Sequence, residues 1–126
     1  MALALLYNLS DQAKLRALRF AFVKFGVRAR VVAPEEFAQP VGLLCAREGF
    51  SPATAPVEGG FSDEMLVLDG LSEAQLDRLL DTLRRSRVRI ALKAVVTKEN
   101  AAWSSLRLHE ELRREHEAMK AVRAQG

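Results

Sequence analysis

The first 33 residues carry an apolar run, then a helical pattern, then a second apolar run. Residues 3–8 predict a strand, and Ser10 directly after them predicts a helix start, because its side chain can cap free backbone N–H groups. Gly26 supplies a left-handed helix end, and residues 28–33 predict a returning strand. Together these features predict a strand–helix–strand unit over residues 1–33. Between the two strands, apolar residues at helical spacing indicate one buried helix face: Leu15, Leu18, Phe22 and Phe25.

The same order recurs about sixty residues later. Residues 65–69 are an apolar run, and Ser72 with Gln75 three positions on forms a capping box at a helix start. Residues 88–97 then return as a strand. The helix cap, the buried helix face and the returning strand follow in the same order in both segments. Residues 65–97 therefore predict a second copy of the unit. Its stripe of leucines repeats at helical spacing: Leu76, Leu79, Leu80 and Leu83.

Two such units favour an α+β fold of the ferredoxin-like class, with a C-terminal helix added. When the units are aligned, Val27 of the first corresponds to Val88 of the second. That fold places the first strand of each unit in the middle of the sheet. Residues 3–6 and 65–68 are apolar throughout, as strands covered on both faces should be. An α/β flavodoxin-like parallel sheet also places apolar strands centrally and is the alternative. The second strands carry charges typical of sheet edges: Arg28, Arg30 and Lys93.

Residues 34–64 form an insertion that is longer than the hairpin a ferredoxin-like domain needs. The insertion is acidic, yet it holds too many apolar residues for a disordered linker. A short helix within residues 35–47 is expected, either interrupted or restarted at Pro40. Because helices on one face of the sheet leave the other face open, Arg30, Lys93 and Thr97 are expected to point to that open face. The insertion is expected either to cap it or to enclose a ligand pocket with it, unless a second subunit covers the face instead.

The length of 126 residues predicts a single domain over residues 1–126, ending in a helix over residues 98–126. Hydrophobic residues at 49% and charged residues at 28% exclude a disordered chain. A net charge of +3 is too small to identify a nucleic-acid binder by itself. The single Cys45 excludes an internal disulfide and fits a reducing compartment. Because the N-terminal apolar run is too short for a membrane span, a cytoplasmic protein without membrane contact is expected.

Candidate binding residues gather where the second unit ends. Lys93 stands in an apolar strand, and Thr97 and Asn100 follow at the turn into the last helix. Trp103, the only tryptophan, comes next. A cation and hydrogen-bonding groups at a helix N-terminus are suited to an anion, and Gln39 of the insertion is expected to line the same pocket. In the structural alternative, Thr97 or Asn100 caps the last helix. Trp103 then packs on the sheet, and Lys93 lies on an open edge.

Signatures of catalysis and of metal binding are absent from the sequence. His109 and His116 are two helical turns apart, and Arg113 stands where an HExxH motif has its second histidine. The chain has no Walker loop, no GxGxxG and no GxSxG motif. We therefore expect neither a metal nor a cofactor. If the protein is a small enzyme, Lys93 or His116 is the candidate acid–base group.

Basic residues form two groups, one along the first predicted helix and the strand after it and one following the second predicted helix: Lys14, Arg16, Arg19, Lys24, Arg28 and Arg30, and then Arg84, Arg85, Arg87 and Arg89. Such groups can form a nucleic-acid interface. However, only Tyr7 is available to stack on bases from the central strands, and no segment resembles an RNP1 motif. Solvated helix faces are therefore the favoured interpretation, and nucleic acid is disfavoured as a partner.

Several segments together resemble one known family: LLYN (5–8) with Ser10 and Asp11, QPVG (39–42), FSDEM (61–65), ALKAVVT (91–97) with Asn100 and Trp103, EL (111–112) and EHE (115–117). The family is the uncharacterised bacterial family catalogued as domain of unknown function 3783. The resemblance covers most of the chain, from Leu5 to Met119, and is most specific between Lys93 and Trp103. It implies a small cytoplasmic bacterial protein with no established activity, and it transfers no site residue.

The sequence therefore favours a non-enzymatic ligand-binding or protein-interaction module that works as a homo-oligomer. A small anionic ligand is the expected partner, with Lys93 as its point charge and Trp103 as an apolar wall. Two alternatives stay open: a small enzyme acting on an anionic metabolite, and nucleic-acid binding through the basic helix faces. On the last helix, an apolar stripe is expected to pack on the sheet or to form a dimer seam: Leu108, Leu112, Met119 and Val122.

Overall fold

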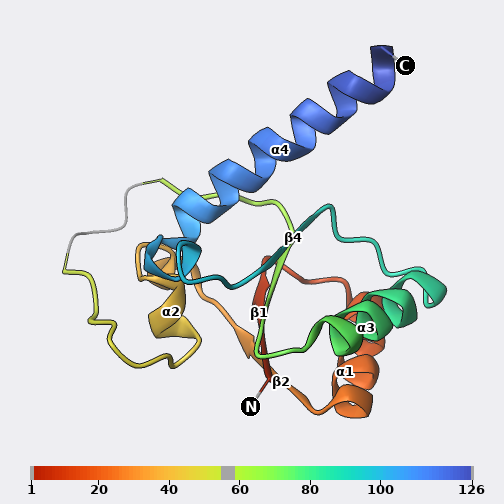
Figure 1. Ribbon diagram of the computed structural model, residues 1–126, viewed down its shortest axis with the longest axis horizontal. Helices are drawn as coiled ribbons and strands as arrows, with labels where there is room; N and C mark the ends of the chain where they lie inside the picture. Colours follow the sequence, from red (N-terminus) through yellow and green to blue (C-terminus); the bar gives the residue numbers. More distant parts are fainter. Residues whose placement is uncertain (1, 55–58, 126) are drawn as a thin grey trace.

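The computed structural model describes residues 2–54 and 59–125. A four-stranded sheet with strand order β2-β1-β3-β4 forms the centre of the molecule (Figure 1). The elements in chain order are β1 (Ala2–Tyr7), α1 (Gln12–Phe25), β2 (Val27–Val31), the 3-10 helix η1 (Pro34–Glu36), α2 (Val41–Leu44), β3 (Met65–Asp69), α3 (Glu73–Arg85), β4 (Leu92–Val95), the 3-10 helix η2 (Asn100–Ala102) and α4 (Ser105–Gln125).

The pairing of the strands makes the sheet mixed. β1 pairs in parallel with β2, β3 pairs in parallel with β4, and β1 and β3 are antiparallel. The α+β class, the two strand–helix–strand units and the C-terminal helix are confirmed, as are the central places of β1 and β3. The ferredoxin-like fold is not confirmed exactly, because its split units separate the two strands of each unit, which here lie side by side. The parallel flavodoxin-like alternative is wrong, since β1 and β3 run in opposite directions.

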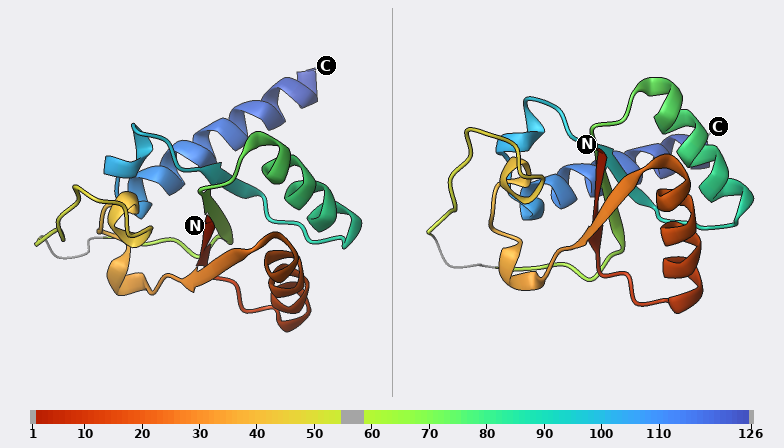
Figure 2. Two further views of the ribbon diagram at one scale, coloured as in Figure 1. Left: turned by 60° about the horizontal axis from the view of Figure 1, so that its bottom comes forward. Right: turned by 90° about the horizontal axis from the view of Figure 1, so that it is seen from below.

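Both faces of the sheet are covered, because each central strand sends alternate side chains to opposite sides. Ala4 and Leu6 of β1 pack with α1 and α3, whereas Leu5 and Tyr7 pack with the insertion, η2 and α4. Figure 2 shows α1 and α3 together on one side of the strands and α2 and α4 on the other. The insertion thus caps the second face, as one of the two expectations has it. Three of its side chains are buried there: Phe37, Val41 and Leu44.

Local capping follows the sequence at most helix ends. Asp11 rather than Ser10 caps α1, because the helix begins one residue later than expected and the Asp11 carboxylate accepts a first-turn N–H. Gly26 ends α1 with a φ of 67°, as predicted. The capping box of Ser72 and Gln75 at α3 is confirmed.

Two elements are shorter than predicted. β4 begins only at Leu92, because Leu92 pairs with Met65, the first residue of β3, and the residues before it have no strand beside them. The last helix begins at Ser105, because η2 precedes it. The short helix in the insertion restarts at Pro40 as predicted, with Pro40 in the N-cap position of α2.

Candidate functional site

A groove of about 1100 Å³ opens between the end of α3, the segment 86–91, the start of β4 and the outer α4 segment, residues 112–123. Its floor is made of apolar side chains: Leu80, Leu83, Val88, Ile90 and Leu92. Of the described side chains, seven that line the groove are basic: Arg84, Arg87, Arg89, Lys93, Arg113, Lys120 and Arg123. Three are acidic: Asp63, Glu64 and Glu117. The excess of positive charge over an apolar floor is suited to an anionic ligand.

Arg87 lies at the mouth of the groove in a left-handed backbone conformation, with a φ of 59°. Its N–H donates to the carbonyl of Arg84 at 3.0 Å, and the N–H of Val88 donates to that of Leu83 at 2.9 Å. These bonds close α3 on a left-handed residue. The equivalent position in the first unit is Gly26, for which this conformation carries no steric cost. The second unit therefore keeps a strained arginine where the first has glycine.

Lys93 is the one predicted binding residue that lines the groove. It lies in register with Leu66, on the sheet face covered by α1 and α3, and not on the face expected to be open. Its ammonium group donates to the carbonyl oxygen of Ile90 at 2.7 Å. Desolvation by partial burial lowers the pKa of Lys93. A bound anion would counteract this effect, because a nearby negative charge favours the ammonium form.

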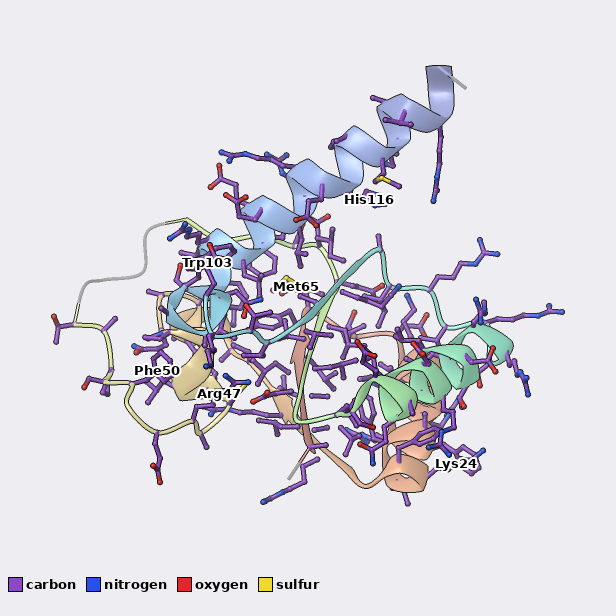
Figure 3. All side chains as sticks on the ribbon, viewed as in Figure 1. Lys24, Arg47, Phe50, Met65, Trp103 and His116 are labelled. Carbon is purple, nitrogen blue, oxygen red and sulfur yellow. The ribbon has the colours of Figure 1, made fainter. Side chains whose placement is uncertain are left out.

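His116 lies on the side of the outer α4 segment that faces the rest of the molecule (Figure 3). It lines the groove described above and also a smaller one of about 190 Å³. The smaller groove is bordered by Leu112 and Met119 of α4 and by Leu92 of β4. Lys93 also borders both grooves, so the two groups considered as candidates for acid–base chemistry lie beside the same surface.

Thr97 and Asn100 bond to each other and hold the turn after β4. The Thr97 N–H donates to Oδ1 of Asn100 at 2.7 Å, and the Asn100 N–H donates to Oγ1 of Thr97 at 3.1 Å. Nδ2 of Asn100 donates to the carbonyl of Val95 at 3.0 Å. Asn100 is buried, and its side chain is committed to these backbone groups. Thr97 and Asn100 therefore have the capping role of the structural alternative, but they cap the turn at η2 and not the last helix itself.

Trp103 and Gln39 lie near the start of α4, about three helical turns before His116. Trp103 packs partly buried against the core, and the guanidinium of Arg107 lies 4.3 Å from the centre of its ring. The Gln39 amide bonds to both backbone groups of Ala53, at 2.8 and 3.3 Å. The backbone joins the two regions, since the Val41 N–H donates to the Trp103 carbonyl at 2.8 Å. Neither side chain lines the groove that contains Lys93.

His109 has a structural contact that the sequence did not indicate. Its ring stacks on Phe61 with centroids 3.9 Å apart, and its Nε2 lies 2.7 Å from a carboxylate oxygen of Asp63. Phe61 stacks in turn on Phe37 at 4.5 Å. These contacts attach the end of the insertion to α4 and leave His116 as the histidine that borders the groove.

Most of the groove's basic residues were missed as members of a site. Arg84, Arg87 and Arg89 belong to the second basic group of the sequence, which is most simply explained as a solvated helix face. Their juxtaposition with Arg113, Lys120 and Arg123 depends on the path of α4 over the sheet. The signal available in the sequence was the arginine run itself, without an indication of what lies opposite. In the first basic group, Lys14 is paired with Glu64 and Arg30 with Glu36.

Other kinds of site find no support among the described residues. No group of three histidine, cysteine, aspartate or glutamate side chains there could hold a metal ion. Nor does any described helix have the length and apolar character needed to span a membrane. Desolvation by burial raises the pKa of Cys45 to about 12, so its sulfur stays a thiol near neutral pH.

A comparison with protein families matches residues 64–119 to the model described as Domain of unknown function (DUF3783). The match spans β3, α3, β4, η2 and most of α4, and it includes five of the seven basic residues described in the groove. The resemblance is confirmed for this part of the chain, and for the residues before it the resemblance stays a prediction. No curated protein matches the chain.

Proposed function

We propose that this protein, whose residues 64–119 match the DUF3783 family, is a non-enzymatic binding module for an anionic ligand held in the groove between α3 and α4. The observation that carries the proposal is the gathering of seven basic side chains, against three acidic ones, around an apolar floor. A cytoplasmic location belongs to the proposal and is supported by the single, half-buried Cys45 thiol.

The physical chemistry of the groove favours anions with more than one charged group. Arg87 and Arg113 can each bind a carboxylate or phosphate through two N–H groups, while Lys93 supplies a point charge. The apolar floor reduces screening by water and strengthens these interactions. The volume of about 1100 Å³ lies at the upper end of the range for small-molecule sites, so a single small anion would leave much of the groove unfilled.

The other predicted binding residues take a supporting place in this proposal. Thr97 and Asn100 hold the end of β4 and the turn before α4, and the Trp103 carbonyl joins this region to the insertion by accepting the Val41 N–H. Gln39 holds the insertion in shape by bonding to Ala53 within it. These contacts set the direction in which α4 leaves the sheet. The wall that carries Arg113 and the other α4 cations depends on that direction.

The test is an NMR titration of the ¹⁵N-labelled protein with inorganic phosphate, pyrophosphate and citrate. We expect pyrophosphate or citrate to shift amide signals of residues 84–93 and 113–123 selectively. The double variant Arg87→Ala/Lys93→Ala should lose these shifts. The control Arg16→Ala/Lys24→Ala removes the same charge from α1, outside the groove, and should retain them.

Two results would refute the proposal: the absence of groove-specific shifts with all three anions, or an equal loss of binding in the control. Nucleic-acid binding is a separate outcome, recognised by tighter binding of an oligonucleotide than of pyrophosphate and by a steep fall of its affinity with salt. Against it, no phenylalanine, tyrosine or tryptophan is among the described side chains that line the groove.

A small enzyme acting on an anionic metabolite is the second candidate, favoured by the presence of Lys93 and His116 beside the same two grooves. Catalysis would require one of them to exchange a proton with a bound substrate. In this structure one N–H of the Lys93 ammonium donates to the Ile90 carbonyl, which leaves its other donors for a bound anion. Prolonged incubation with each anion, followed by NMR of the small molecule, distinguishes the two functions, because a binding module leaves the anion unchanged.

A further inference from the structure

We infer that the outer α4 segment is the docking surface for a second copy of this chain, with the two helices antiparallel about a two-fold axis. Figure 1 and the left view of Figure 2 show this end of α4 extending beyond the sheet. Two large apolar side chains are exposed on it, Met119 at 55% and Val122 at 64%. The inference concerns the oligomer and does not depend on the ligand of the groove.

The exposed pair continues a stripe that is buried further in. Leu108 is 2% exposed in the core, and Leu112 packs against the same cluster. From Leu108 the stripe runs through Leu112, Glu115, Met119 and Val122 in alternating steps of four and three residues. This spacing is the seam pattern of paired helices. The sheet covers the inner end of the stripe, and a second helix would cover the outer end.

The charges along α4 determine the orientation of the pair. Residues 110–117 contain four glutamates and two arginines, whereas residues 118–125 contain Lys120 and Arg123 and no acid. Arg114 already pairs with Glu110 and Glu111 in the same helix. In parallel helices, the acidic stretch 110–117 of one copy would lie beside the same stretch of the other, and so would the basic stretch 118–125, so like charges would repel. Antiparallel helices place the acidic turn of one copy beside the basic turn of the other.

The point of closest crossing follows from the stripe. A two-fold axis at Met119, midway between Glu115 and Arg123, places Glu115 beside Arg123 of the partner subunit, and the reverse contact forms by symmetry. Met119 then packs near the axis, against the same region of the other helix. Among the described residues Glu115 has no hydrogen bond or ion pair of its own, so its carboxylate is available for this contact.

The other exposed apolar pair on a helix does not suit a second copy. Phe20 and Val23 of α1 are 75% and 83% exposed, but Arg16, Arg19 and Lys24 surround them on a stretch without acids. A two-fold contact through this face would bring like charges together, which is unfavourable. Among the helices that the structure describes, only the outer α4 segment combines large exposed apolar residues with both signs of charge. The paired segments are about 18 Å long, so the interface is small and its dimer should dissociate on dilution.

The experiment is sedimentation equilibrium of the full chain over a wide concentration range. We expect a monomer–dimer equilibrium that Met119→Asp/Val122→Asp abolishes, with no change in thermal stability, because both side chains are already exposed. Phe20→Asp/Val23→Asp makes the matched change on α1 and should leave the dimer intact. A monomer at every concentration, or a dimer lost only in the α1 control, would overturn the inference.

Charge reversal tests the orientation. In antiparallel helices Glu115→Lys or Arg123→Glu alone should raise the dimer dissociation constant roughly threefold to tenfold. Mixing the two variants should restore association, because each reversed charge then meets an opposite one. If each single variant dimerises as well as the parent protein, the antiparallel arrangement is refuted.

Discussion

Replacing Arg87 by glycine should stabilise the protein while weakening the binding of anions. Arg87 occupies the left-handed position that ends α3, with a φ of 59°. In the first unit, the left-handed residue that ends α1 is Gly26, with a φ of 67°. The left-handed backbone of Arg87 lowers the stability of the fold, whereas its side chain lines the groove and contributes to anion binding. The two effects can therefore be measured separately.

The magnitude follows from two opposing effects. A left-handed conformation costs an ordinary residue about 1–2 kcal/mol, which Arg87→Gly removes. Glycine also makes the unfolded chain more flexible, which costs about 0.4–1 kcal/mol. The net gain in the free energy of unfolding should be about 0.5–1 kcal/mol, or a rise in Tm of roughly 2–5 °C for a domain of this size.

Urea unfolding of Arg87→Gly and the parent protein measures this gain. Gly26→Ala is the matched control: an added Cβ has no neighbour within 4 Å there, so backbone strain alone should destabilise the variant by about 1 kcal/mol. If Arg87→Gly destabilises the fold, or if both variants shift stability in the same direction, the strain argument is refuted. Titration with pyrophosphate should show weaker binding to Arg87→Gly than to Gly26→Ala.

Three further predictions concern the rest of the fold. Asn100→Ala removes the side-chain partner of two part-buried backbone groups, the Thr97 N–H and the Val95 carbonyl, and should lower the free energy of urea unfolding by about 1–3 kcal/mol; because Asn100 holds the turn that sets the direction of α4, anion binding should weaken as well, and unchanged stability would contradict this. Phe37→Ala empties a site that is 2% exposed and should cost about 3–5 kcal/mol, whereas a cost below about 1 kcal/mol would show that the insertion is peripheral. The pKa of Cys45 rises on folding from 9.0 to about 12, so its contribution to stability is complete below pH 9 and is lost as pH rises toward 12. Between pH 9 and pH 12 the free energy of unfolding should fall less steeply with pH in Cys45→Ala than in the parent protein. Equal slopes would refute the raised pKa of Cys45.

The sequence by itself determined the two strand–helix–strand units and the local features that bound them. Gly26, the box of Ser72 and Gln75, and the restart at Pro40 are all found where predicted. The apolar runs 3–6 and 65–68 lie in the central strands β1 and β3, and the charged β2 and β4 are at the edges. These features are readable because capping and helical or strand periodicity depend on residues only a few positions apart. The one-residue error at Ser10 reflects a neighbour, Asp11, that is an equally good cap.

Only the tertiary structure decided which strands pair and which charges meet. The apolar runs do not show that the second neighbour of β1, beside β3, is β2 rather than β4, since either arrangement buries the same side chains. The face on which Lys93 lies depends on its register with Leu66. The groove joins arginines that follow α3 to cations on α4, about thirty residues later in the chain. Contacts over such separations depend on the path of the chain through space, and short-range patterns of polarity do not record that path.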